Sequence, residues 1–207
     1  MKHHLLKVAT ILALGLSAIA ASHSQAAQAS DQTLKNLNTA FEGESNAANR
    51  YAIFAKAADV EGHAQVAKLF RAASAAEAIH RDTHREAILE LGGTPATFLL
   101  EAVTPASTEE NLKAAIEGES YERDTMYPDF LAVAKTDDAR AAIRTLNFAL
   151  AAEKEHAALY AEALSTLGKN APADYYVCNV CGMTLTELPA KKCPSCRKSK
   201  DEYQQIL

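Results

Sequence analysis

Apolar and small residues recur at helical spacing through most of the chain, and this pattern predicts four long helices. The first covers residues 31–62. One of its faces carries Leu37, Phe41, Glu44, Ala48, Tyr51 and Ala55. The second covers residues 63–91 and ends at the Gly-Gly-Thr-Pro run that starts at residue 92, a strong helix terminator.

The third predicted helix begins at Ser107-x-x-Glu110, which matches a capping box, and continues to about residue 136. The fourth begins near Asp137 or Asp138 and ends before Gly168. Very short turns join the first helix to the second and the third to the fourth. Each pair is therefore predicted to be an antiparallel hairpin.

A segment of about 15 residues, 92–106, separates the two hairpins. Fully extended, it reaches roughly 50 Å, whereas a helix of about 27 residues is only ~40 Å long. The connection can therefore cross the whole bundle. The predicted fold is mainly α, a four-helix bundle over residues 31–168 with one long crossover.

An internal repeat relates the two hairpins. The run Glu-Gly-Glu-Ser at residues 42–45 recurs at residues 117–120, a shift of 75. The run Ala-Ala-Glu-x-x-His at residues 75–80 recurs at residues 151–156, a shift of 76. Two copies of one hairpin, each with the same acidic and histidine positions, predict a pseudo-symmetric bundle.

Each hairpin thus carries one Glu on its first helix and Glu-x-x-His on its second, which is typical of carboxylate-bridged two-metal bundles. Residues three apart share one face of a helix. Glu77 with His80, and Glu153 with His156, can therefore hold one ion each. Four helices facing inward would bring the two half-sites together.

Most glutamates on helices are solvated, so a location on the protein surface is the alternative to a metal site. Glu44, however, lies between Phe41 and Tyr51 on the apolar face, and Glu153 follows Leu146 and Leu150 at the same spacing. Unpaired carboxylates buried there would cost several kcal/mol each. Two divalent ions would supply a charge of +4 and relieve most of that repulsion, so the pattern favours the metal site.

One position breaks the symmetry of the repeat. Glu122 lies three residues after Glu119, whereas the matching position after Glu44 is Ala47. The predicted site then has five carboxylates and two imidazoles, one ligand more than the basic set. Such an unequal site can let one metal change ligands with its oxidation state.

The last 34 residues, 174–207, follow a short linker at 169–173 and hold every cysteine. They form two CxxC knuckles separated by 11 residues, a strong signal for a tetrahedral metal site: Cys178 with Cys181, and Cys193 with Cys196. Disulfides are the alternative in an exported protein. Pairing within a CxxC motif, however, would close a small, strained ring. A segment this short has little apolar core without a cross-link, and a bound metal ion would supply one. Four thiolates fit zinc or iron, and the redox-capable neighbour favours iron.

Residues 1–26 are predicted to be a secretory signal. Lys2 and Lys7 precede an apolar run at residues 8–21, which is shorter than the ~20 residues needed to span a membrane. The protein is therefore predicted to be exported to the periplasm, with no membrane contact after cleavage. A formal net charge of −5 argues against a nucleic-acid partner, which would require a basic stripe.

Taken together, these motifs resemble the rubrerythrin family across essentially the whole mature chain. The resemblance rests on Gly43-Glu44-Ser45 with Tyr51, Glu77-x-x-His80, Gly118-Glu119-x-x-Glu122, Met126-Tyr127-Pro128, Glu153-x-x-His156 and the two cysteine knuckles. It implies a ferritin-like bundle followed by a small rubredoxin-like domain.

The resemblance also implies a function, a non-haem di-iron peroxidase that reduces hydrogen peroxide to water in oxidative-stress defence. Its cofactors would be two iron ions in the bundle and one iron ion at the four cysteines. The di-iron ligands would be Glu44, Glu77, Glu119, Glu122, Glu153 and His156, with His80 exchanging with Glu122 when the cluster is reduced. Tyr51 and Tyr127 would hydrogen-bond to the ligands. Members of the family resemble one another in forming head-to-tail dimers, so a homodimer is expected. The resemblance also implies that an unidentified electron-donor protein reduces the iron sites.

Two other functions stay open from the sequence. One is ferroxidase or iron-handling activity with O₂ as the oxidant, and the other is a metal-binding structural or sensing module with zinc in the knuckles. The chain also departs from the family pattern. Arg197 stands where rubredoxins commonly have Gly, an export signal is unusual in the family, and Ala47 supplies no additional helix-borne acid.

Overall fold

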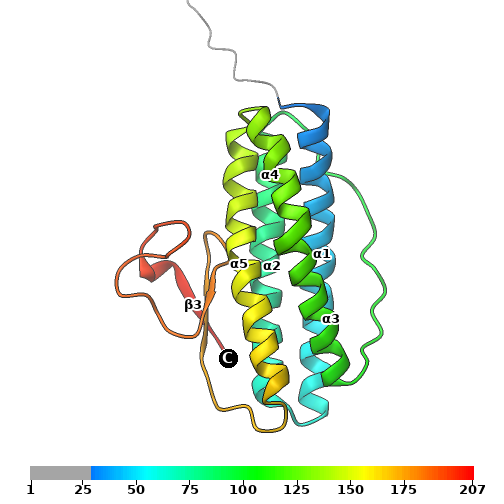
Figure 1. Cartoon of the computed structure of the whole chain (residues 1–207), viewed down its shortest axis with the longest axis vertical. Coiled ribbons are helices and arrows are strands. Elements are labelled where there is room, and N and C mark those ends of the chain that lie inside the picture. The colour runs from blue at the N-terminus through cyan, green and yellow to red at the C-terminus, as the bar shows by residue number, and fades with distance from the viewer. Residues whose placement is uncertain (1–28) are drawn as a thin grey trace, which may run out of the picture.

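The computed structural model describes residues 29–207, and two long antiparallel helices form its first hairpin (Figure 1). Helix α1 (Asp31–Val60) begins at Ser30, whose hydroxyl accepts a hydrogen bond from a backbone amide of the first turn. It ends before Gly62, where a φ of +82° lets the chain reverse. Helix α2 (Ala64–Glu90) then runs back and ends before Gly92, which also has a positive φ.

The second hairpin contains the other helices of the bundle. Its elements are α3 (Thr108–Tyr121), η1 (Glu122–Met126), α4 (Tyr127–Thr136) and α5 (Arg140–Ser165). The predicted capping box at Ser107 and Glu110 is confirmed, because each side chain bonds the backbone of the other. The turn into α5 passes through Asp138, which adopts a positive φ of 47°.

The third predicted helix differs from expectation at one place. Its helical course over residues 107–136 is confirmed, but η1 is a π-helical turn in which the Tyr127 amide bonds the Glu122 carbonyl five residues back. A π turn accommodates one extra residue without ending the helix. This explains why the internal repeat shifts from 75 to 76 between the first and second helix of a hairpin, since the extra residue lies in η1.

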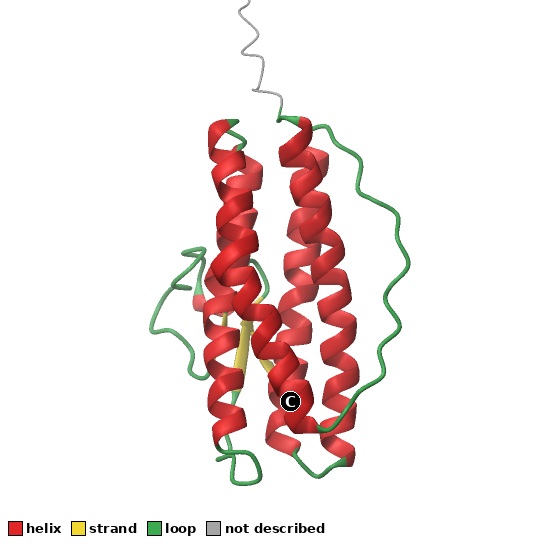
Figure 2. Ribbon diagram, turned by 45° about the vertical axis from the view of Figure 1, so that its right-hand side comes forward, coloured by secondary structure: helices red, strands yellow, loops and turns green. Residues whose placement is uncertain are grey.

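The crossover connection, residues 92–106, runs along the outside of the bundle from one end to the other (Figure 2). Two side chains of α1 hold it in place. The Asn38 carboxamide accepts from the Ala96 amide at 2.7 Å, and the Asn46 carboxamide accepts from the Glu101 amide at 3.0 Å. The predicted bundle with one long crossover is confirmed.

The apolar core is divided into two clusters along the bundle axis. One is rich in aromatic rings, including Tyr51, Phe70 and Tyr160, and the other contains aliphatic residues such as Leu37 and Leu146. On every long helix, the predicted ligand positions fall between the residues of these two clusters. The polar site therefore lies in the middle of the bundle, closed off by apolar packing on both sides.

The C-terminal lobe contains a small antiparallel sheet in the order β2-β1-β3, formed by β1 (Tyr175–Cys178), β2 (Thr184–Leu185) and β3 (Tyr203–Ile206). It packs against α2 and α5 of the same chain. The two cysteine knuckles occupy the turns between the strands. The lobe thus lies against the side of the bundle (Figure 1), where the Cys181 carbonyl contacts the buried His80.

No helix within residues 29–207 is long and apolar enough to cross a membrane. The predicted signal segment, residues 1–26, lies outside the residues that the structure describes.

Candidate metal centres

Four helices of the bundle bring two overlapping groups of ligand atoms together. Within each group, one ligand atom from every residue lies within 4.8 Å of the others. The first group is Glu44, Glu77, His80 and Glu153, and the second is Glu77, Glu119, Glu153 and His156. Glu77 and Glu153 belong to both groups, which is the arrangement expected of carboxylates that bridge two metal ions.

The chemistry of these residues fits two cations. All six are almost completely buried, and Glu153 has no exposed surface. One oxygen each of Glu44, Glu77, Glu119 and Glu153 is buried without a hydrogen-bond partner. Buried acceptors normally have partners because desolvation without compensation is costly. Bound metal ions are partners that would satisfy all of these oxygens at once.

In each of the two clustered histidines, the two ring nitrogens contact different parts of the molecule. His80 Nδ1 lies 2.8 Å from a Glu77 oxygen, and His156 Nδ1 lies 3.1 Å from a Glu153 oxygen. Both Nε2 atoms point out of the cluster toward the C-terminal lobe. His80 Nε2 donates to the Cys181 carbonyl at 3.2 Å, which fixes the tautomer and leaves Nδ1 available for a metal.

His156 makes the equivalent contact through a side chain. Its Nε2 donates to the Thr184 hydroxyl at 2.9 Å, and that hydroxyl in turn donates to the Gly182 carbonyl at 3.2 Å. Both Glu-x-x-His motifs are therefore held in orientation by the C-terminal lobe.

Two tyrosines buried beside the cluster follow the same repeat. Tyr51 donates a hydrogen bond to Glu119, and Tyr127 donates one to Glu44. Each hairpin thus supplies a hydroxyl to the carboxylate of the other hairpin. The two tyrosines are 76 positions apart, whereas Glu44 and Glu119 are 75 apart. The extra residue in η1 lies between Glu119 and Tyr127 and accounts for this difference.

Without a cation, the cluster holds its protons unevenly. Burial, together with the charge of Glu77, raises the pKa of Glu44 to about 8. Burial also acts to raise the pKa of Glu77, but His156 and His80 outweigh it and lower that pKa to about 2. Burial alone would lower the pKa of His80, yet Glu77 and Glu44 raise it to about 9. A metal ion must therefore displace protons to enter.

The structure brings six of the seven predicted bundle ligands into the two groups and leaves Glu122 beside them. Glu122 lies at the start of η1 and is only partly buried. Its pKa is nevertheless raised well above the usual value, by desolvation and by the charges of Glu44, Glu119 and Glu77. The arrangement seen is the one in which His80, and not Glu122, joins the ligand group.

His84 is a buried polar residue that the sequence interpretation missed. Its Nε2 lies 3.2 Å from the Tyr127 hydroxyl, and its Nδ1 lies 2.9 Å from the Thr145 hydroxyl. Burial and the nearby His80 lower its pKa to about 3, so the ring is neutral. The available signal was its spacing, because His84 is four residues after His80 and so shares its helix face.

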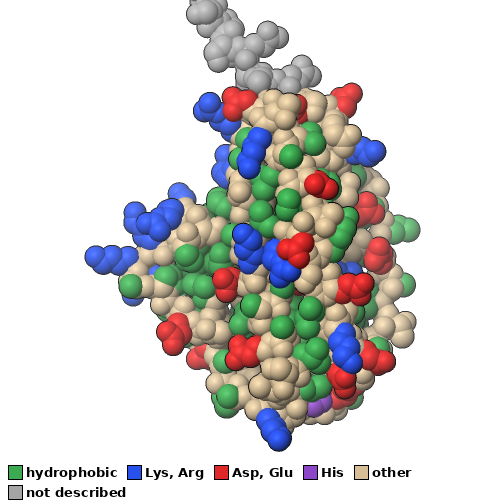
Figure 3. Space-filling model, viewed as in Figure 1, with side chains coloured by type: hydrophobic (Ala, Val, Ile, Leu, Met, Phe, Trp, Pro, Cys, Tyr) green, Lys and Arg blue, Asp and Glu red, His purple; other side chains and the backbone are tan. Residues whose placement is uncertain are grey.

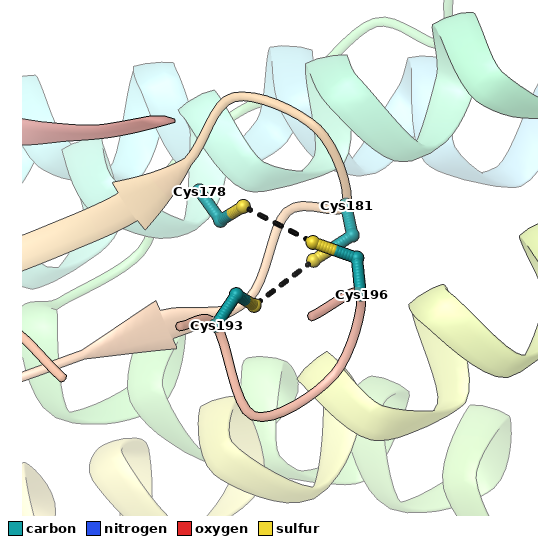
Figure 4. Close-up of side chains that lie close together, drawn as sticks. All are labelled: Cys178, Cys181, Cys193 and Cys196. Carbon is teal, nitrogen blue, oxygen red and sulfur yellow. Dashed lines mark hydrogen bonds between the residues drawn. The ribbon is translucent and has the colours of Figure 1, made fainter. Parts of the chain in front are cut away.

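The four cysteines of the C-terminal lobe point toward one another from the two knuckle loops (Figure 4). Cys178 and Cys196 have their sulfurs 3.7 Å apart, and Cys181 and Cys193 have theirs 3.6 Å apart. These distances are far too long for a disulfide, which needs about 2.05 Å. A tetrahedral ion with metal–sulfur bonds of about 2.3 Å would place sulfurs about 3.8 Å apart. The sulfur positions therefore fit a mononuclear metal site.

The two centres are in contact through the first knuckle. Gly182 follows Cys181 with a φ of +74°, and a Cβ placed there would lie 2.2 Å from His80 Nε2. Only glycine allows both this backbone conformation and this approach. The lobe can therefore lie directly against a histidine of the bundle cluster.

Comparison with known proteins agrees with this geometry. Residues 35–164 match the rubrerythrin family. Rubrerythrin-2 of Clostridium acetobutylicum is 32% identical over 81% of this chain and 93% of its own length. Nigerythrin of Nitratidesulfovibrio vulgaris is 34% identical over 83% of this chain and 85% of its own length. A structure of nigerythrin described as fully reduced and all ferrous superposes with a TM-score of 0.76 at 30% identity, covering 97% of this chain and 100% of that one.

The family match covers more than half of the chain, and the alignment with nigerythrin covers 97% of it. Family members carry a di-iron site, and the buried carboxylate–histidine cluster is a group of residues that could hold it here. The four-cysteine cluster corresponds to a rubredoxin-like iron site. The chain belongs to the rubrerythrin family of di-iron oxidoreductases.

Proposed function

We propose that this protein reduces hydrogen peroxide to water at the bundle site, with electrons supplied through the four-cysteine site. The reaction consumes one peroxide, two electrons and two protons and releases two water molecules. One observation supports it above the others. His80 of the bundle cluster donates a hydrogen bond to the backbone carbonyl of Cys181, a residue of the other cluster.

When bound, the two iron ions supply the electrons for breaking the O–O bond and the positive charge that binds oxygen ligands. The chain's own residues hold that charge in place. Four buried glutamates from the groups compensate two divalent ions, and the apolar clusters on both sides keep bulk water out. Tyr51 and Tyr127 fix the orientation of Glu119 and Glu44.

The position of Glu122 supports a role in turnover rather than in assembly. It is partly buried, it lies next to three cluster glutamates, and it is absent from both ligand groups. We infer that Glu122 and His80 are alternative ligands for one metal position, used in different oxidation states. Glu122 would then be neutral when it is not a metal ligand and ionised when it is bound to the metal.

Delivery of electrons from the lobe to the bundle does not require a second subunit in this structure, because the lobe packs on its own bundle. The homodimer therefore stays a prediction that rests on the family resemblance. Export to the periplasm is likewise part of the proposal, supported by the charge and apolar pattern of residues 1–26.

Anaerobic peroxide consumption by the iron-loaded protein tests the proposal. We expect one peroxide to be lost for every two electrons drawn from a chemical reductant. The Glu122→Ala variant should turn over about 10- to 100-fold more slowly, the usual effect of disturbing groups around a metal. Its unfolding midpoint should stay close to that of the parent protein. Peroxide turnover that is unaffected by the substitution would contradict the exchange role of Glu122.

A further inference from the structure

We propose that His84 is a positioning residue for one of the two metal positions of the bundle, the one held by Glu44 and His80. It acts through Tyr127, whose hydroxyl it fixes in the orientation that donates to Glu44. The inference rests on the proposed function, in which His80 and Glu122 exchange at this same position. It adds the residue that keeps the neighbouring carboxylate in place during that exchange.

The hydrogen bonds around His84 fit together in only one way. The Tyr127 hydroxyl gives its single hydrogen to Glu44, so its oxygen accepts from His84. The Nε2 atom, 3.2 Å from that oxygen, therefore carries the ring hydrogen. The ring is neutral because burial and the charge of His80 lower its pKa to about 3. Nδ1 thus has no hydrogen of its own and accepts one from the Thr145 hydroxyl at 2.9 Å.

The result is a chain of three hydrogen bonds that runs from Thr145 to Glu44, with every donor facing the cluster. None of its four residues is more than 2% exposed. Thr145 fixes the tautomer of His84. The ring in turn orients the Tyr127 hydroxyl, which orients Glu44. A buried polar network in which each member has its partner is rigid, and such partners keep a metal ligand in its binding geometry.

The other half of the internal repeat lacks this chain. Tyr51 occupies the position equivalent to Tyr127 and donates to Glu119, but the residue equivalent to His84 is Tyr160. The centroids of the two tyrosine rings are 5.6 Å apart, and the Tyr160 hydroxyl is buried without a hydrogen-bond partner in residues 29–207. Within the described part of the molecule, only one of the two metal positions is therefore supported in this way.

The outer end of the chain returns to the same metal position. The Thr83 hydroxyl contacts the Thr145 hydroxyl at 2.8 Å and donates to the His80 carbonyl at 2.9 Å. Both threonines line a pocket of about 370 Å³ that also borders Cys196, where the lobe meets the bundle. Figure 3 shows the lobe packed against the side of the bundle. One network thus connects the carboxylate of Glu44 with the helix turn that carries His80.

Titration of the metal-free protein with Co²⁺, used in place of Fe²⁺, tests the proposal without turnover. Visible absorption distinguishes binding at thiolates from binding at carboxylates and imidazoles, and calorimetry gives the affinity of each bundle position. The side chain of His84→Asn keeps a polar group near Thr145 but is too short to reach Tyr127. The matched control is His84→Gln, whose longer amide reaches the Tyr127 hydroxyl.

We expect His84→Asn to weaken one bundle position by about 10- to 100-fold and to leave the other nearly unchanged. His84→Gln should keep most of the parent affinity. Tyr127→Phe should cause the same one-sided loss, and His84→Asn added to it should have little further effect, because the chain is already broken. Tyr160→Phe removes a hydroxyl without a partner and should change neither position.

Equal weakening of both bundle positions by His84→Asn would indicate a general effect on the fold and would overturn the proposal. Parent affinities in that variant, an equal loss in His84→Gln, or additive losses with Tyr127→Phe would overturn it too. Co²⁺ binding at the four cysteines reports whether each variant is folded. If His84→Asn does not fold, Thr145→Val replaces it and Thr145→Ser, which keeps the hydroxyl, is its control. The same one-sided loss is expected for the valine variant alone, and unchanged affinities would contradict the proposal. Peroxide consumption by the iron-loaded parent tests the proposed function separately, since these affinities do not depend on it.

Discussion

At the scale of single residues, His80 and His156 each join two parts of the molecule. Their Nδ1 atoms lie among the cluster carboxylates, and their Nε2 atoms bond groups of the C-terminal lobe. A substitution of either histidine would therefore remove a proposed metal ligand and a contact with the C-terminal lobe together. More selective substitutions are those of residues that do not themselves belong to the two groups of ligand atoms.

Thr145 offers such a selective change. Its hydroxyl contacts His84 Nδ1 at 2.9 Å and the Thr83 hydroxyl at 2.8 Å, in a buried position. The Thr145→Val substitution keeps the shape but leaves a buried imidazole nitrogen unpaired. We expect it to lower the free energy of unfolding by about 1–3 kcal/mol.

Chemical denaturation of the metal-free protein measures this loss. The exposed Thr136, in the last turn of α4, is the matched control, and Thr136→Val should change the free energy of unfolding by less than about 0.5 kcal/mol. Equal effects at the two positions would show that the His84 contact does not contribute.

The clustering of the glutamates and histidines was predictable from the sequence because the repeat places equivalent residues on equivalent helix faces. Glu44 pairs with Glu119 in that repeat, and Glu77-x-x-His80 pairs with Glu153-x-x-His156. His84 was not predictable, because its repeat equivalent is Tyr160 and a lone histidine on a helix has many roles. Its contacts with Tyr127 and Thr145 arise only when three helices pack together.

At the scale of elements, helices and turns followed from periodicity and capping residues, but the π turn did not. A π turn moves the apolar positions that follow it along by one residue, which is too small a change to be recognised from the periodicity of one short segment. The change of repeat shift from 75 to 76 was its only trace in the sequence. The contact between the lobe and the bundle was also unpredicted, because a single glycine, Gly182, allows it.

The Gly182→Ala substitution tests that contact. Alanine there would have an unfavourable φ, and its Cβ would clash with the His80 ring, so the lobe must move away. We expect the four-cysteine absorption to remain, while re-reduction of the oxidised bundle site through the lobe slows markedly. Stopped-flow absorption of the two iron sites measures both.

The Gly43→Ala variant is the control for this substitution. Gly43 lies within α1, and a Cβ there would meet nothing within 4 Å. Alanine should stabilise the helix by about 0.5–1 kcal/mol and leave electron transfer unchanged. Re-reduction at the parent rate in the Gly182 variant would mean that electrons do not pass through the Cys181–His80 contact.

At the scale of the whole molecule, the buried cluster links stability, pH and metal content. The pKa values of Glu44 and His80 are raised to about 8 and about 9 in the folded metal-free protein, from 4.5 and 6.5. A group with a raised pKa stabilises the fold below its unfolded pKa, and that stability is lost as pH rises through the folded value.

The metal-free protein should therefore become less stable as the pH rises from about 5 to about 9. Iron should remove most of this loss, because the cations replace the protons that the carboxylates would otherwise hold. Thermal unfolding of chelator-treated and iron-loaded samples at several pH values measures the difference. Metal-free protein that is most stable at the alkaline end would contradict the electrostatic description of the cluster.

The most direct test of the central claim is stopped-flow spectroscopy of the fully reduced, iron-loaded protein, mixed in separate experiments with hydrogen peroxide and with air-saturated buffer. If the protein is a peroxidase supplied through its cysteine site, peroxide should reoxidise both iron sites rapidly, and O₂ should do so much more slowly. Faster oxidation by O₂ would instead indicate a ferroxidase, and a protein without the four-cysteine iron absorption would have no internal route for electrons.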